Sequence, residues 1–104
     1  MRQERRLHRR YVVAWGLKGK VLTAMEEDGT VSERPSADIR GEISDISGGG
    51  LCLITSEKTD PKTAMRCEIF APHVPVGIPT LLQVRWVHEN VGGRMYTLGM
   101  QFVV

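Results

Sequence analysis

Short stretches of alternating apolar and polar residues occupy the second half of the chain, and they restrict the folds that are open to it. These stretches are Met65–Ile69, Leu82–Trp86 and Tyr96–Phe102. A period of two residues is typical of a strand that buries one face and exposes the other. Within the second stretch the pattern places Leu82, Val84 and Trp86 on one face, with Gln83 and Arg85 on the other.

The first half of the chain also favours strands. β-Branched and aromatic residues fill Tyr11–Met25, where Gly16 and Gly19 indicate a bend or a bulge. Two further extended segments are predicted at Ala37–Ile46 and Leu51–Thr55. Turn or loop segments separate the predicted strands: Glu26–Gly29, Thr30–Ser36 with Pro35, Gly48–Gly50, Ser56–Lys62, Ala71–Pro79 and Asn90–Gly93. Short strands without an amphipathic helix predict an all-β fold, either a small antiparallel barrel or a sandwich.

Size and composition indicate one domain with a modest core. The chain has 104 residues, of which 41% are hydrophobic and 25% are charged. No apolar run has membrane-spanning length, and no signal-peptide pattern follows the basic N-terminus. We therefore expect a cytoplasmic protein without a membrane partner. Cys52 and Cys67 lie in apolar segments, which favours buried free thiols and leaves a single disulfide as the alternative.

Positive charge is concentrated in the first ten residues. Five arginines and Glu4 give this arm a formal charge of +4, whereas the whole chain carries +2. We therefore divide the chain into a basic arm, residues 1–10, and a barrel domain, residues 11–104. Arginine is a planar fork that binds phosphate or a guanine edge at two points, so the arm is a candidate anion-binding element. The alternative is a solvated tail or a nonspecific polyanion contact.

A second candidate element is Asp45–Gly50, which has the form Asp-x-Ser-x-x-Gly. Residues two apart on a strand share a face, so Asp45 and Ser47 would present a carboxylate and a hydroxyl side by side. A carboxylate can accept two hydrogen bonds from the donor edge of guanine. Gly50 would allow a sharp turn and the close approach of a ligand. The alternative is a side-chain turn that only closes a hairpin.

Arg6-x-x-x-Arg10, a long strand and then Asp45-x-Ser47-x-x-Gly50 together resemble the PilZ domain family. Val84–Trp86 and Leu98–Phe102 are similar to the last two strands of that family, so the resemblance covers nearly all of the chain. It implies a six-stranded antiparallel β-barrel that binds the bacterial second messenger cyclic di-GMP. By the same resemblance, Arg6 and Arg10 would hold guanine and phosphate groups, Asp45 and Ser47 would read a guanine, and Gly50 would shape the turn below it.

The arginine motif can be read in two registers, Arg6 with Arg10 or Arg5 with Arg9. We favour the first, because Arg10 then directly precedes the first strand, as in the family. Arg5 would then stand immediately before the motif, where a basic residue goes with two bound cyclic di-GMP molecules in the family. We therefore expect two ligands per chain. Arg9 and Trp86 are additional candidate ligand contacts.

Other functional classes find less support in the sequence. His8, His73 and His88 have no carboxylate or cysteine at ligand spacing, so no metal site is expected. No nucleophile motif points to catalysis, and we expect neither an enzyme nor a cofactor. The expected function is a cyclic di-GMP receptor that signals through ligand-induced ordering to an unidentified downstream protein. Two rival functions are a small barrel that binds single-stranded nucleic acid through its arm and a ligand-free PilZ-like protein-interaction domain.

Overall fold

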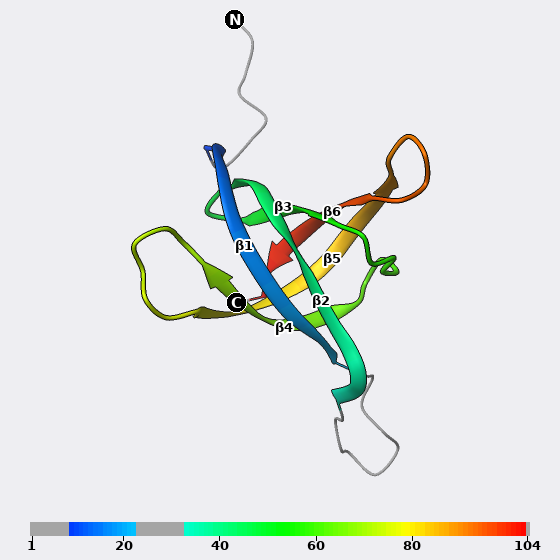
Figure 1. The fold of residues 1–104 in the computed structure, drawn as a ribbon, viewed down its shortest axis with the longest axis horizontal. Helices are drawn as coiled ribbons and strands as arrows, with labels where there is room; N and C mark the ends of the chain where they lie inside the picture. Colours follow the sequence, from blue (N-terminus) through cyan, green and yellow to red (C-terminus); the bar gives the residue numbers. More distant parts are fainter. Residues whose placement is uncertain (1–8, 23–32, 104) are drawn as a thin grey trace, which may run out of the picture.

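Six strands form the regular structure of the protein in a computed structural model that describes residues 9–22 and 33–103. They are β1 (Tyr11–Leu22), β2 (Glu33–Ile46), β3 (Gly50–Thr55), β4 (Ala64–Phe70), β5 (Ile78–Glu89) and β6 (Tyr96–Phe102) (Figure 1). The described residues contain no helix, and hence none that could cross a membrane. The prediction of an all-β fold is confirmed.

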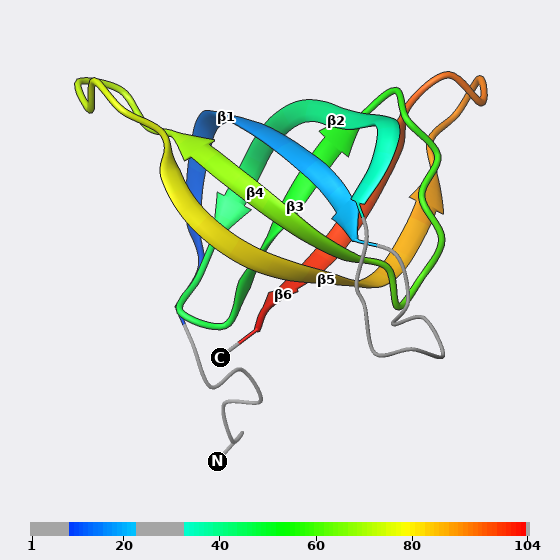
Figure 2. The same ribbon diagram turned by 90° about the horizontal axis from the view of Figure 1, so that it is seen from below.

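The strands close into an antiparallel barrel in the order β1-β2-β3-β6-β5-β4 (Figure 2). Closure depends on pairing between β1 and β4, and β3 pairs with β6 across the intervening hairpin of β4 and β5. The six-stranded antiparallel barrel implied by the family resemblance is therefore confirmed. Alternating side chains from all six strands fill the interior, among them Leu17, Ile43, Leu53, Met65, Leu82 and Leu98. Cys52 and Cys67 are buried and unlinked, as predicted.

Two prolines lie inside strands where the sequence predicted a loop or a connection. β2 begins at Glu33 and so includes Pro35, and β5 begins at Ile78 and so includes Pro79. Proline has no N–H to donate and is tolerated where one edge of the strand has no partner. β2 pairs with β3 only from Gly41 onward, and β5 pairs with β6 only from Leu82 onward. Pro79 therefore lies where β5 pairs with β4 alone, and Pro35 lies in the irregular part of the β1–β2 pairing, between the paired residues Glu33 and Asp38.

Two β-bulges reverse the faces expected from alternation. Ile43 pairs with Leu53 and Asp45 with Cys52, so Ser44 is the extra residue in β2. Without this bulge Asp45 would share the face of Ile43, which is fully buried in the core. A bulge at Arg85 in β5 acts in the same way on Trp86, which does not share the inward face of Val84. The alternation of Leu82–Trp86 was thus a wrong guide for Trp86.

Candidate functional site

Four residues in cross-strand register form the base of a surface cavity. Asp45 of β2 pairs with Cys52 of β3, Cys52 pairs with Gly99 of β6, and Gly99 pairs with Trp86 of β5. The cavity has a volume of about 410 Å³ and is lined by Arg10, Asp45, Ser47, residues 49–52, Arg85, Trp86 and residues 99–101. The small residues Cys52 and Gly99 lie between Asp45 and Trp86 in this row, where Cys52 is contacted by the Arg10 guanidinium and Gly99 by the Trp86 indole.

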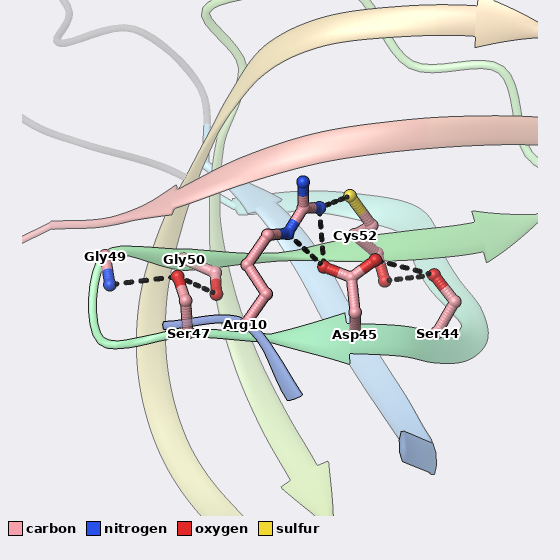
Figure 3. A network of polar contacts seen from close by, with 7 residues as sticks. All are labelled: Arg10, Ser44, Asp45, Ser47, Gly49, Gly50 and Cys52. Carbon is pink, nitrogen blue, oxygen red and sulfur yellow. Dashed lines mark hydrogen bonds and ion pairs between the residues drawn. The ribbon is translucent and has the colours of Figure 1, made fainter. Parts of the chain in front are cut away.

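Arg10 reaches this cavity from the residue just before β1 and binds Asp45 (Figure 3). Arg10 Nε and Nη2 both donate to Asp45 Oδ1, at 2.9 and 2.6 Å. Arg10 Nη2 also donates to Cys52 Sγ at 3.0 Å. Asp45 Oδ2 lies 3.5 Å from Ser44 Oγ, a long contact that leaves this oxygen able to accept further donors.

The protonation states of this group follow from its contacts. The hydrogen bond to Asp45 raises the pKa of Arg10 above its usual value, so Arg10 stays cationic. Burial, and next the charge of Asp45, raise the pKa of the Cys52 thiol, so Cys52 is a neutral acceptor near pH 7. One cation and one anion are thus held together at the β2 end of the cavity, with the Cys52 thiol beside the guanidinium (Figure 3).

Ser47 and Gly49 form the turn between β2 and β3. Ser47 Oγ accepts a hydrogen bond from Gly49 N at 3.2 Å and donates to the Gly50 carbonyl oxygen at 3.3 Å. Ser47 N also donates to this carbonyl at 2.8 Å. The hydroxyl thus closes the hairpin, and Ser47 also lines the cavity beside Asp45. The two interpretations of the Asp-x-Ser-x-x-Gly motif, a hairpin turn and a pair of neighbouring polar groups, therefore describe the same residues.

Gly50 is required for a reason that the sequence did not indicate. The only described glycines with positive φ are Gly92 and Gly93, so the turn does not need the left-handed conformation at Gly50. Instead, a Cβ atom at Gly50 would collide with the backbone carbonyl of Met100 on β6. The absence of a side chain permits the close approach of β3 and β6 under the cavity.

We expect Gly50→Ala to destabilise the barrel by about 1–3 kcal/mol, because the Met100 carbonyl can move only if the pairing of β3 and β6 opens. Chemical denaturation followed by far-UV circular dichroism measures this loss. Gly16→Ala is the matched control, because Gly16 also lies in a strand without positive φ, and a Cβ there would meet Phe70 Cβ only at an ordinary 3.8 Å. Equal stability of Gly50→Ala and wild type would contradict the steric explanation.

Trp86 forms the opposite wall of the cavity. Its indole lies against Gly99, where a Cβ atom would collide with Trp86 Nε1 and Cε2. The residue keeps 47% of its surface exposed, so one region of the ring stays open to the cavity. Trp15, by contrast, packs against the core. An exposed aromatic face supported from behind is suited to stacking on a planar base or a guanidinium.

The structure brings together Arg10, Asp45, Ser47, Gly50 and Trp86 from the predicted site residues. Arg5 and Arg6 lie outside the described residues. Arg9 is exposed and does not line the cavity, so the described part of the arm favours Arg10 as the residue that enters the site.

Sequence reasoning missed Cys52, Arg85 and Gln101, which also line the cavity. Cys52 and Gln101 each pair across strands with a residue of the site, so the barrel register would have revealed them. Alternation placed Arg85 opposite the core face of Leu82 and Val84, but it did not indicate that this outward face lines the cavity. The described residues contain no cluster of histidine, cysteine and acidic side chains that could hold a metal ion.

The fold and the cavity define a class of protein, a small closed β-barrel with an arginine–aspartate site on its outer wall. The chain belongs to the PilZ domain family, whose match covers residues 2–104. The resemblance noted from the sequence motifs is therefore confirmed. No curated protein matches the sequence.

Solved structures show the same fold at low sequence identity. The inhibitor of motility MotI/DgrA of Bacillus subtilis has a TM-score of 0.70 and 17% identity, and the match covers 100% of this chain and 44% of that one. YcgR of Escherichia coli, solved in complex with c-di-GMP, gives 0.63 and 14%, covering 96% and 38%. The PilZ domain of YcgR with c-di-GMP gives 0.61 and 11%, covering 96% and 79%. The chain thus spans less than half the length of the first two proteins.

Proposed function

We propose that this chain is a receptor module for cyclic di-GMP and has no catalytic role. The observation that carries this proposal is the single cavity that joins Arg10 to Asp45 and Ser47. The two motifs are 35 residues apart at the Arg10–Asp45 pair, yet their side chains make direct contact. Membership of the PilZ family supports the ligand, as do the two YcgR structures determined with c-di-GMP.

The chemistry of the cavity suits the parts of this ligand. Cyclic di-GMP contains two phosphates and two guanines, so it calls for guanidinium groups, stacking surfaces and a carboxylate acceptor. Arg10 supplies a cation, Trp86 an exposed ring face and Asp45 Oδ2 an acceptor for guanine donors. Arg6 would add a second guanidinium from the arm.

Signalling would follow from the arm. We propose that residues 1–10 close over the bound ligand and present a new surface to a downstream protein in the cytoplasm. Proteolysis by trypsin tests this step, because trypsin cleaves after arginine and the arm contains five arginines. Cleavage in the arm should slow when the ligand is bound. Cleavage at an unchanged rate in the saturated complex would contradict arm closure.

Titration calorimetry with cyclic di-GMP tests the proposed function, with GTP, cyclic di-AMP and a short single-stranded oligonucleotide measured beside it. We expect binding of cyclic di-GMP alone or in strong preference. Preferential binding of the oligonucleotide would identify the rival nucleic-acid barrel. The absence of binding to every ligand, by a protein with a folded circular-dichroism spectrum, would leave the protein-interaction domain.

The number of bound ligands is a separate prediction. Arg5 precedes the Arg6–Arg10 motif, and an additional guanidinium there can offset the charge of four phosphates from two stacked ligands. We expect saturation at two ligands per chain, and Arg5→Leu should lower the ratio toward one without abolishing binding. Arg2→Leu makes the same charge change and should leave the ratio at two. Saturation of wild type at one ligand would contradict this prediction.

A further inference from the structure

Arg85 is the charged residue of the cavity that neither sequence motif includes. Val84 pairs with Met100 and Trp86 pairs with Gly99, so Arg85 is the unmatched residue of a β-bulge. Neighbours in a regular strand point to opposite faces, whereas a bulge can redirect one of them. Arg85 and Trp86 are both exposed, and both line the cavity. The bulge thus places a guanidinium beside an aromatic ring on one wall.

The charges in the cavity are unevenly compensated. Its described lining contains three ionised side chains, those of Arg10, Asp45 and Arg85. Arg10 and Asp45 form an ion pair and neutralise one another at the β2 end. Arg85 makes no hydrogen bond or ion pair with any described residue. The uncompensated positive charge of the described lining therefore lies at the β5 end, away from both motifs.

The distance between the two ends suits an extended ligand with more than one anionic group. β3 and β6 lie between β2 and β5 in the barrel, so three inter-strand spacings separate Asp45 from Trp86. At about 4.8 Å per spacing, this is about 14 Å along the curved wall. This is the separation of the backbones; the Arg10 guanidinium contacts Cys52 and the Trp86 indole lies over Gly99, so the side chains of the two ends approach one another more closely. A ligand lying across this part of the wall would contact Arg10 at one end and Arg85 at the other.

We propose that Arg85 binds a phosphate of cyclic di-GMP while Trp86 stacks on the adjacent guanine, an inference that rests on the proposed function. The planar fork of Arg85 can hold two phosphate oxygens at once. Gly99 supports the indole from behind, so the ring does not have to reorient when a base stacks on it. The bulge at Arg85 is therefore a third ligand-binding element, beside the arginine arm and the Asp45–Gly50 motif.

Calorimetry of wild type and three variants at low and at physiological salt tests this proposal. Arg85→Gln removes the charge, and Arg85→Lys retains the charge without the fork. Arg94→Gln is the matched control, because Arg94 is exposed, lies in the β5–β6 turn and does not line the cavity. We expect Arg85→Gln to lower affinity for cyclic di-GMP by about tenfold or more. Its binding should also depend less on salt than that of wild type.

Arg85→Lys should have an intermediate affinity, and Arg94→Gln should match wild type in affinity. If wild type does not bind cyclic di-GMP, the proposed function itself is wrong. If wild type binds and Arg85→Gln binds equally well, only the role of Arg85 is overturned. A weakened Arg85→Gln whose salt dependence equals that of wild type would exclude the phosphate contact. If Arg85→Gln does not fold, Arg85→Met is judged by the same criteria.

Discussion

Replacing Arg10 with alanine is expected to weaken cyclic di-GMP binding by about 2–5 kcal/mol while the barrel stays folded. The substitution removes the cation at the β2 end of the cavity and leaves Asp45 without its partner. The unpaired carboxylate would then repel the phosphates of the ligand. Arg10 precedes β1 and its side chain is 37% exposed, so the hydrophobic core does not depend on it. Calorimetry measures the affinity, and circular dichroism the fold.

Arg9→Ala is the matched control for this experiment. Arg9 carries the same charge at the adjacent position but does not line the cavity. We expect Arg9→Ala to bind nearly as tightly as wild type, and Arg6→Ala to behave like Arg10→Ala. If Arg9→Ala and Arg5→Ala were instead the weakened pair, the other register of the arginine motif would be correct. Wild-type affinity in Arg10→Ala would remove this residue from the site.

Asp45→Ala is expected to weaken cyclic di-GMP binding about as much as Arg10→Ala does. It should also reduce the selectivity for cyclic di-GMP over cyclic di-AMP. Wild type should discriminate against cyclic di-AMP, because adenine lacks the N1 and N2 donors of guanine and would leave the acceptor unpaired. Loss of the carboxylate should reduce this discrimination by about 1–3 kcal/mol. Asp45→Glu keeps the acceptor and should retain more affinity than Asp45→Ala. Calorimetry with both cyclic dinucleotides gives the ratio of affinities.

Because Asp45 forms an ion pair with Arg10, the ratio of the affinities for cyclic di-GMP and cyclic di-AMP is the decisive measurement. Asp45 also holds Arg10, so Asp45→Ala could weaken binding merely by releasing the guanidinium. A role limited to holding Arg10 would lower the affinities for cyclic di-GMP and cyclic di-AMP by the same factor. Recognition of guanine would lower the first affinity selectively. Equal affinity of wild type for both dinucleotides would exclude Asp45 as the selectivity residue.

The sequence was informative wherever structure depends on local pattern. Tyr96–Phe102 was predicted with the bounds that β6 has, because strict alternation over seven residues leaves only one period. The burial of the Cys52 and Cys67 thiols was predicted from the apolar segments in which these residues lie. The candidate arm and the Asp45–Gly50 motif were visible from residue types and spacing alone. These features require no knowledge of which strands pair.

Strand ends were less predictable where proline was involved. Pro35 and Pro79 marked predicted loop or connection segments, yet both belong to strands. Proline is excluded only where its missing N–H would face a partner strand. Whether a partner is present depends on how far β3 and β6 extend along their neighbours. That extent is a property of the closed barrel, which the local sequence does not contain.

The residue types by themselves predicted a small β-protein, and its two motifs resembled those with which the PilZ family binds cyclic di-GMP. Only the tertiary structure decided which faces these residues occupy. The bulges at Ser44 and Arg85 turn Asp45 and Trp86 away from the faces that alternation predicts. A bulge is defined by the pairing of a strand with its neighbour, here β2 with β3 and β5 with β6, and a one-residue shift moves a side chain to the opposite face. Alternation predicted that Arg85 faces outward, but only the order of strands in the barrel places it beside the residues of the two motifs.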